Sequence, residues 1–314
     1  MANTILLALA PVFFVMALGY GAGRLRIVDN SQVDGFNALV MSFALPAALF
    51  VAMASAPRSE MFAQAPLFGI LGIVMLLVYF GWYFLVRTWR VTKADASLQA
   101  LTVAFPNIAG VGLPISLAVL GPDGTVPAAV VLAAGSILVS PQTLVVLEMS
   151  SKKGEASEQP TARVARAIRR ALSKPIVVAP ALGILVSLSG LQLGSVVDAC
   201  LMLIGHAAPG VALFLTGLIL SAQPFRLDWK VVSATWIGDI IRPLLTAAVV
   251  FLLPVPTETA KVAILLAAVP SGFFGILFAV NYRLDSATVG SMVTASTVSS
   301  IVTMAIAIAV LFPH

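Results

Sequence analysis

The sequence predicts an all-α integral membrane protein with ten transmembrane helices in two inverted five-helix repeats. Three observations support this prediction: a strongly apolar composition, a regular alternation of apolar segments with charged loops, and an internal duplication. The 314 residues are 60% hydrophobic and only 10% charged, and their mean hydropathy is +1.05. A soluble domain has about 25% charged residues, so most of this surface is expected to face lipid.

Ten segments have the apolar length, about 20 residues, that crosses a bilayer. They cover residues 4–23, 35–55, 65–87, 97–120, 126–148, 174–190, 198–221, 230–253, 259–281 and 288–312. The polar stretch 149–173 divides them into a first repeat, 1–148, and a second repeat, 174–314. Its part from Thr161 to Leu172 is either a solvated linker that fixes topology or a basic amphipathic helix on the membrane surface.

The distribution of positive charge predicts the orientation in the membrane. Fifteen of the 18 Lys and Arg residues fall in the loops after the first, third, fifth, seventh and ninth segments, against two in the opposite loops. Because cytoplasmic loops are rich in Lys and Arg, both termini are expected outside. No positive residue precedes the first segment, which favours an uncleaved helix over a signal peptide.

The composition also argues against several classes of function. A single cysteine, Cys200, allows neither an internal disulfide nor a cysteine-based metal site, and His206 and His314 form no H-x-x-x-H pair. The sequence has no phosphate-binding loop and no set of residues suited to catalysis. We therefore expect no enzyme activity, no bound metal and no cofactor. Since the positive charge follows the loops, no nucleic acid partner is expected either.

An internal repeat relates the two halves at an offset of 164 residues. The matches are Pro11 with Pro175, Ala17–Gly19 with Ala181–Gly183, Ala48–Phe50 with Ala212–Phe214, and Ala104 and Pro106 with Ala268 and Pro270. Five spans per half is an odd number, so the second half enters the membrane from the opposite side. Inverted repeats of this kind are a recurrent plan of secondary transporters.

The fourth and ninth segments carry helix breakers at equivalent positions, in "AFPNIAGVGLP" and "AVPSGFFGILF". Proline removes a backbone donor, and unpaired backbone is tolerated at membrane depth only beside protein or a water-filled cavity. Two broken helices that cross would direct half-helix N-termini at an anion. The expected crossover residues are Pro106, Pro114 and Pro270, and the expected substrate contacts include Asn107, Gly110, Ser271 and Gly272. A simple proline kink in each helix is the alternative.

Two charged residues, Asp239 and Arg242, lie inside the eighth segment, three positions apart on one expected helix face. In one interpretation they form an ion pair that locks this segment to the crossover. In the other, Arg242 receives a substrate carboxylate through two N–H bonds while Asp239 orients it or titrates. We include both residues in the candidate substrate site.

Three stretches resemble the bacterial members of the auxin efflux carrier family: "APVFFVMALGYGAGRLRIVD", "NALVMSFALPAALF" and "AFPNIAGVGLPI". Within that family the chain looks most like carriers assigned to malonate. The resemblance implies crossing broken helices in segments 4 and 9, a scaffold of segments 1, 2, 6 and 7 that forms a homodimer, and a moving domain of segments 3–5 and 8–10. Ser271 stands where an amide would be expected, so auxin is not the expected substrate.

Together these observations predict a secondary active transporter in a bacterial inner (plasma) membrane. Its expected partners are the lipid bilayer and a small organic anion, such as the dicarboxylate malonate, moved by alternating access. Symport with a proton or a sodium ion would suit the uptake of a dianion. The alternatives are an anion channel and a membrane sensor of a carboxylate, with residues 149–173 as its output.

Overall fold

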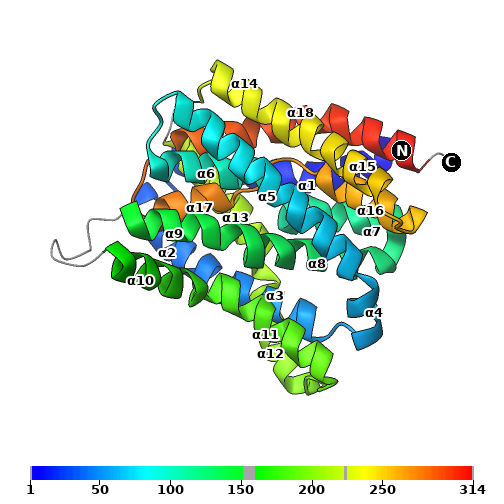
Figure 1. Ribbon diagram of the computed structural model, residues 1–314. Coiled ribbons are helices and arrows are strands. Elements are labelled where there is room, and N and C mark those ends of the chain that lie inside the picture. Colours follow the sequence, from blue (N-terminus) through cyan, green and yellow to red (C-terminus); the bar gives the residue numbers. More distant parts are fainter. Residues whose placement is uncertain (1, 151–159, 223–224, 313–314) are drawn as a thin grey trace.

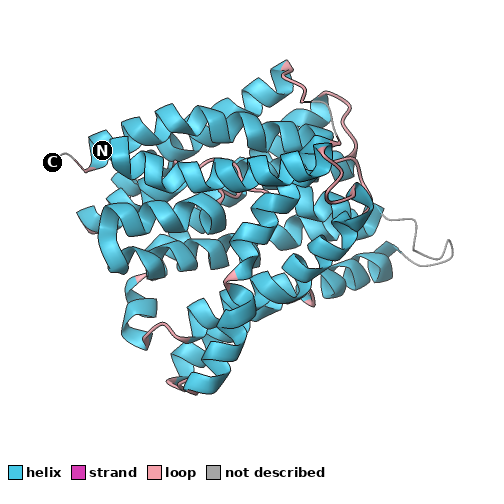
Figure 2. Cartoon of the chain, turned by 180° about the vertical axis from the view of Figure 1, so that it is seen from behind, coloured by secondary structure: helices cyan, strands magenta, loops and turns pink. Residues whose placement is uncertain are grey.

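Helices make up nearly the whole structure, a computed structural model that describes residues 2–150, 160–222 and 225–312. Most of them run between the same two ends of the molecule (Figure 1). Seen from behind, loops are confined to the ends of helices and to breaks within them (Figure 2). In the described ranges no strand forms, and the only β-type pairing is an isolated bridge, Pro106 with Ser271.

The first half of the chain forms the elements α1 to α9. Their bounds are α1 (Ala2–Arg24), η1 (Asn30–Gln32), α2 (Val33–Leu39), η2 (Val40–Ala44), α3 (Leu45–Ala54), α4 (Arg58–Ala63), α5 (Ala65–Thr88), α6 (Lys93–Ala104), η3 (Ile108–Gly112), α7 (Leu113–Leu120), η4 (Gly121–Gly124), α8 (Thr125–Ala134), η5 (Gly135–Val139) and α9 (Ser140–Ser150).

The second half forms α10 to α18. Their bounds are α10 (Pro160–Leu172), α11 (Pro175–Ser189), α12 (Ser195–Gly205), α13 (Ala207–Ser221), α14 (Trp229–Trp236), η6 (Ile237–Ile241), α15 (Arg242–Leu252), α16 (Thr257–Ala267), α17 (Phe274–Asn281) and α18 (Ala287–Leu311). The elements η2, η5 and η6 are single π-helical turns inside longer helices, and η3 is a π-helical turn that begins the half-helix Ile108–Leu120. Such turns are rare and frequently mark functional sites.

Six helical stretches among the described residues are long and apolar enough to cross a membrane, or seven if a pair bent by 60° counts as one span. They are Asn30–Ala54, Ala65–Thr88, Thr125–Ser150, Ser195–Ser221, Trp229–Leu252 and Ala287–Leu311, with the bent pair Val164–Leu172 and Pro175–Ser189. The first, fourth and ninth expected segments lie outside this count, and the fourth and ninth are each divided into short helices. The chain is therefore a multi-span membrane protein, and ten spans remain a prediction.

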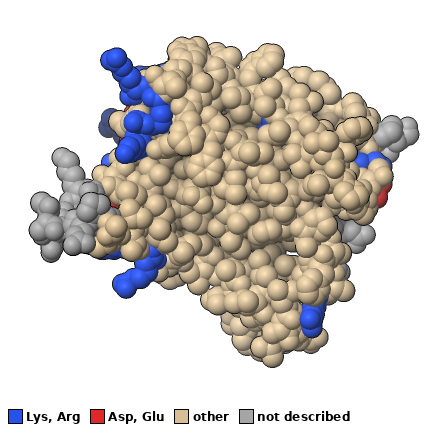
Figure 3. Space-filling view, viewed as in Figure 1, with Lys and Arg blue, Asp and Glu red and all other residues tan. Residues whose placement is uncertain are grey.

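The surface separates charge from apolar side chains as a bilayer would require. Lys and Arg gather at the end where α9 ends and α10 begins, with few at the other end and a nearly uncharged face between (Figure 3). Many large apolar side chains are exposed, among them those of Phe251, 89% exposed, and Leu203, 83% exposed. The start of α1 and the end of α18 lie at the end with few cations (Figures 1 and 3).

Part of the polar stretch 149–173 is helical: α10 packs against α9 and buries Ala167 and Ala171. Its remaining apolar residues, Val164, Ile168 and Leu172, are exposed along one face. This stretch therefore forms an amphipathic helix, and its position on the membrane surface stays a prediction. At its end, Arg170 contacts Glu148, whose carboxylate also accepts a hydrogen bond from the Tyr282 hydroxyl at 2.7 Å. Burial and this carboxylate raise the pKa of Tyr282 far above its usual range.

Two glycines let helices from opposite halves touch backbone to backbone. A Cβ on Gly19 of α1 would stand 2.0 Å from the carbonyl oxygen of Phe214 on α13, and a Cβ on Gly183 of α11 would stand 2.6 Å from that of Phe50 on α3. Both glycines and both carbonyls are related by the offset of 164 residues. The two contacts therefore have reciprocal partners in the two halves.

We predict that Gly19→Ala destabilises the protein, because the added methyl group must push α1 away from α13. Overpacking of this kind costs about 1–3 kcal/mol. The matched control is Gly21→Ala, since a Cβ on Gly21 meets nothing within 4 Å. Thermal unfolding of the purified proteins in detergent measures the difference. Equal melting temperatures for the two variants would contradict the close approach.

Candidate functional site

The breaks in the fourth and ninth segments lie against each other. Asn107 donates its N–H to the carbonyl of Pro270 at 2.8 Å, and Gly272 donates its N–H to the carbonyl of Phe105 at 2.9 Å. These two bonds flank the antiparallel bridge between Pro106 and Ser271. The backbone freed by the two prolines is thus paired inside the protein, as membrane depth requires.

Asn107 caps the half-helix that follows the first break. Its Oδ1 accepts the N–H of Gly110 at 3.0 Å, and the next helical stretch runs from Ile108 to Leu120, with Pro114 near the start of α7. Only 2% of Asn107 is exposed, and its Nδ2 makes no hydrogen bond within the described part of the chain. The amide therefore keeps a donor available at the N-terminus of this half-helix.

At the second break, the space beside Gly272 is too small for any side chain. A Cβ there would stand 2.4 Å from the carbonyl oxygen of Phe105, so the two backbones approach as closely as their atoms allow. The neighbouring Ser271 is 1% exposed, and its Oγ has no hydrogen-bond partner among the described residues. The candidate residues Asn107, Gly110, Ser271 and Gly272 are thus brought together at one junction.

Arg242 holds the two half-helices that end at this junction. It is fully buried, and its Nε donates to the carbonyl of Ala267 at 2.9 Å while one terminal nitrogen donates to that of Val103 at 2.6 Å. The other terminal nitrogen donates to the carbonyl of Val269. These carbonyls belong to the C-terminal ends of α6 and α16, where a positive charge is favourable and acceptors lack helical partners.

Asp239 lies in the π-helical turn η6, three residues before Arg242, and contacts α18. Its Oδ1 accepts a hydrogen bond from the Ser296 hydroxyl, and Ser299 is a second hydroxyl that interacts with the carboxylate. Among the described residues the Oδ2 atom has no hydrogen-bond partner, although Asp239 is only 2% exposed. Ser296 in turn accepts the N–H of Ser271 at 2.8 Å. One hydroxyl therefore links the carboxylate to the junction.

The expected contact between Asp239 and Arg242 does not form as an ion pair in the described residues. The reason is the π-helical turn Ile237–Ile241, which widens the helix between the two positions and changes which residues share a face. The two charges still act on each other at longer range. In this structure, Arg242 is occupied with backbone carbonyls, a role that spacing along the sequence does not suggest.

An apolar cavity of about 560 Å³ reaches the start of the capped half-helix. Ile108, Ala109 and Leu113 form one wall, and α3, α8, α12 and α13 supply the others. Its lining also includes the polar residues Asp198 and His206. The loops around it, after α3 and before α12, belong to the side that the charge distribution predicts to be outside.

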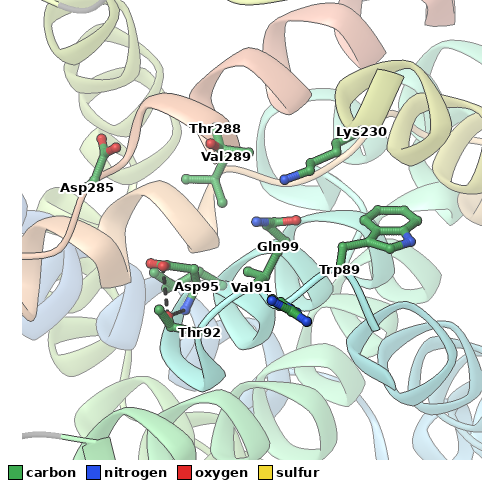
Figure 4. A pocket seen from close by; sticks show the side chains of 11 residues that line it. Trp89, Val91, Thr92, Asp95, Gln99, Lys230, Asp285, Thr288 and Val289 are labelled. Carbon is green, nitrogen blue, oxygen red and sulfur yellow. Dashed lines mark hydrogen bonds between the residues drawn. The ribbon is translucent and has the colours of Figure 1, made fainter. Parts of the chain in front are cut away.

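A second, polar cavity of about 340 Å³ opens at the predicted cytoplasmic end, among α6, α14 and α18. Lys230 and Gln99 point toward one another across it, and Asp95 lies beside Thr92, its hydrogen-bond partner (Figure 4). The Oε1 atom of Gln99 is buried and unpartnered. Sequence patterns gave no signal for Gln99, because a single amide in an apolar segment fits no motif.

Nearly the whole chain matches one protein family. The model of the family described as "Membrane transport protein" matches residues 4–308. The "Uncharacterized transporter YfdV" of Escherichia coli (strain K12) is 29% identical over 297 residues, 94% of each chain. A protein of Rhizobium meliloti (strain 1021) named "Putative malonate transporter" is 24% identical over 222 residues, 69% of this chain and 67% of that one.

We predict that Arg242→Gln unfolds or strongly destabilises the protein, and that Asp239→Asn in the same chain does not rescue it. The reason is that the carbonyls of Val103, Ala267 and Val269 lose their donors. Each buried group left unpaired costs about 1–3 kcal/mol. Thermal unfolding in detergent is the measurement, and Arg226→Lys, at an exposed position, is the control. A double variant as stable as the wild type would favour the ion-pair interpretation instead.

Proposed function

The chain belongs to the membrane transport protein family, and we propose that it is a secondary active transporter of a small organic anion. The observation that carries this proposal is the bridge between Pro106 and Ser271, where two broken helices meet inside an apolar protein. Paired breaks of this kind create helix ends and polar groups at membrane depth, where transporters bind their substrates. We place the protein in a bacterial inner membrane with both termini outside.

The inverted repeat is part of the proposal, and the reciprocal glycine contacts support it. Gly19 meets the carbonyl of Phe214, and Gly183 meets that of Phe50, as a two-fold relation between the halves requires. The helix pairs α1 with α13 and α3 with α11 would then form the scaffold. The remaining long helices, with the crossover, would form the domain that moves and exposes the site alternately to the two sides.

The proposed substrate is a dicarboxylate such as malonate. The capped half-helix begins at the apolar cavity, and a helix N-terminus favours an anion there. The free Nδ2 of Asn107 adds a donor for one carboxylate. The N-terminus of α17, directly after Gly272, offers a second pole. The name of the Rhizobium meliloti relative agrees with this class of substrate.

Purified protein in liposomes tests the proposal with labelled malonate. A carrier is expected to show saturable uptake that unlabelled malonate inside the liposomes accelerates. Uptake that is insensitive to internal malonate, together with large currents, would favour an anion channel. If no uptake or exchange of malonate or related dicarboxylates occurs, the proposed function is wrong.

Asn107→Ser separates substrate binding from helix capping. Serine keeps a side-chain oxygen for the N–H of Gly110 but lacks the amide donor. Loss of one hydrogen bond to a charged group costs about 1.5–3 kcal/mol, so the apparent affinity for malonate should fall roughly ten- to a hundred-fold. The control is Asn281→Ala, at an exposed position beyond the crossover. Unchanged affinity in Asn107→Ser would remove Asn107 from the site.

Labelling of single cysteines tests the orientation. In a Cys200→Ser background, a cysteine replacing Glu258 should react with a membrane-impermeant maleimide added from outside, because its loop is predicted to be external. A cysteine replacing Asp285, in a predicted cytoplasmic loop, should react only after permeabilisation. Both positions are exposed. Labelling of both from the same side would contradict the proposed topology.

A further inference from the structure

The carboxylate of Asp239 is the least compensated charged group in the core of the molecule. It is 2% exposed, and within the part of the chain that the structure describes neither its Oδ2 atom nor the buried hydroxyl of nearby Ser271 has a hydrogen-bond partner. Burying a charge without pairing is costly, and ionisable residues inside membrane segments are usually functional. A group of this kind needs an explanation beyond packing.

Few charged groups face Asp239 from the elements packed around it. The turn η6 contacts α6, α14, α15 and α18. Lys93 and Asp95 lie in the first turn of α6, and Lys230 lies at the start of α14; in each helix this is the end far from the crossover. The helix α18 carries no charged residue. Arg242 is the charged group that acts on the carboxylate. Its guanidinium is already engaged with three carbonyls, so the compensation is incomplete.

The surroundings of Asp239 suit a proton better than a metal cation. A sodium ion would need several oxygen ligands and room for itself. Ser271 and Ser296 are 1% and 0% exposed, and neither cavity described above is lined by Asp239. Within the described residues no cluster of three acidic, histidine or cysteine side chains occurs. A proton needs only the free Oδ2 and no additional volume.

Protonation of Asp239 would reach the crossover through one hydroxyl. Ser296 donates to Oδ1 and accepts the N–H of Ser271, the residue bridged to Pro106. With an ionised carboxylate the first bond is charge-assisted and roughly twice as strong as a neutral one. Protonation also removes the negative charge that acts on Arg242, which holds both half-helices. The charge state of Asp239 therefore affects both attachments of the crossover.

We propose that Asp239 is the proton-binding site that couples transport to the proton gradient, and that Ser296 is the positioning residue linking it to the crossover. Oδ2 takes a proton from water when the site is open to one side and releases it to water on the other. The proposal rests on the proposed function, that the chain is a carrier, and it names the ion that drives it.

Transport in liposomes gives the first test. Asp239→Asn has nearly the same shape and cannot ionise. An imposed pH gradient should no longer drive malonate accumulation by this variant. A sodium gradient should drive neither protein. The control Asp34→Asn, at an exposed position on α2, should remain coupled. Proton-driven accumulation by Asp239→Asn, or sodium-driven accumulation by the wild type, would overturn the proposal.

Infrared spectroscopy detects proton binding at Asp239 without any substrate. It therefore tests this proposal even if the proposed transport function is wrong. Difference spectra of the purified wild type between acidic and alkaline pH should contain a carboxyl band that Asp239→Asn abolishes and Asp34→Asn retains. Ser296→Ala, which leaves the carboxyl in place, should shift the frequency of this band, since Oδ1 loses its donor. The same spectra for the wild type and Asp239→Asn would refute proton binding at Asp239, whatever the substrate is.

Discussion

The hydrogen bonds from Arg242 to the ends of α6 and α16 are the interaction on which the rest of the structure depends. Breaking two helices inside a membrane protein leaves carbonyls without partners, and lipid offers none. The planar guanidinium supplies N–H groups in several directions and stays charged, so one side chain pairs with Val103, Ala267 and Val269 at once. With these ends held, the bridge at Pro106 and Ser271 can form without a strand on either side.

A second constraint is how closely the backbones approach. Apolar side chains gain little from leaving lipid, so helix association in a membrane depends on close packing and small residues. In the pair α1 and α13, each helix has a glycine at the contact. A Cβ on Gly217 would stand 2.0 Å from the carbonyl oxygen of Met16, and a Cβ on Gly19 would stand 2.0 Å from the carbonyl oxygen of Phe214. At the crossover, Gly272 has the same role against Phe105. Contacts of this kind make rigid units, which a movement of one domain past another requires.

Sequence patterns located the elements better than the interactions between them. Hydropathy placed the apolar segments, and proline with glycine placed both breaks, because each is a local property of the chain. The partners of Arg242 were not predictable, since carbonyl acceptors exist at every residue and leave no trace in residue type. The spacing of Asp239 and Arg242 was misleading, because it assumed an α-helix where a π-turn occurs. The contacts of Ser296 with Asp239 and Ser271, and the place of Gln99 in a cavity, depend on segments that are distant in the sequence.

Among the described residues, those with a positive φ differ in type between the predicted inner and outer sides of the membrane. Arg26, Arg90 and Arg283 have φ of 56°, 61° and 55°, and each follows a helix at a predicted cytoplasmic end. Gly121 and Gly190, with φ of 70° and 77°, end helices at the predicted outer side. Glycine adopts this conformation without strain, whereas other residues rarely do. Arginine is therefore retained at the inner positions for its charge, which is favourable at a helix C-terminus and helps to fix orientation. Among the described residues, positions with a positive φ thus hold arginine at the predicted inner side, where the positive charge also supports the orientation, and glycine at the predicted outer side.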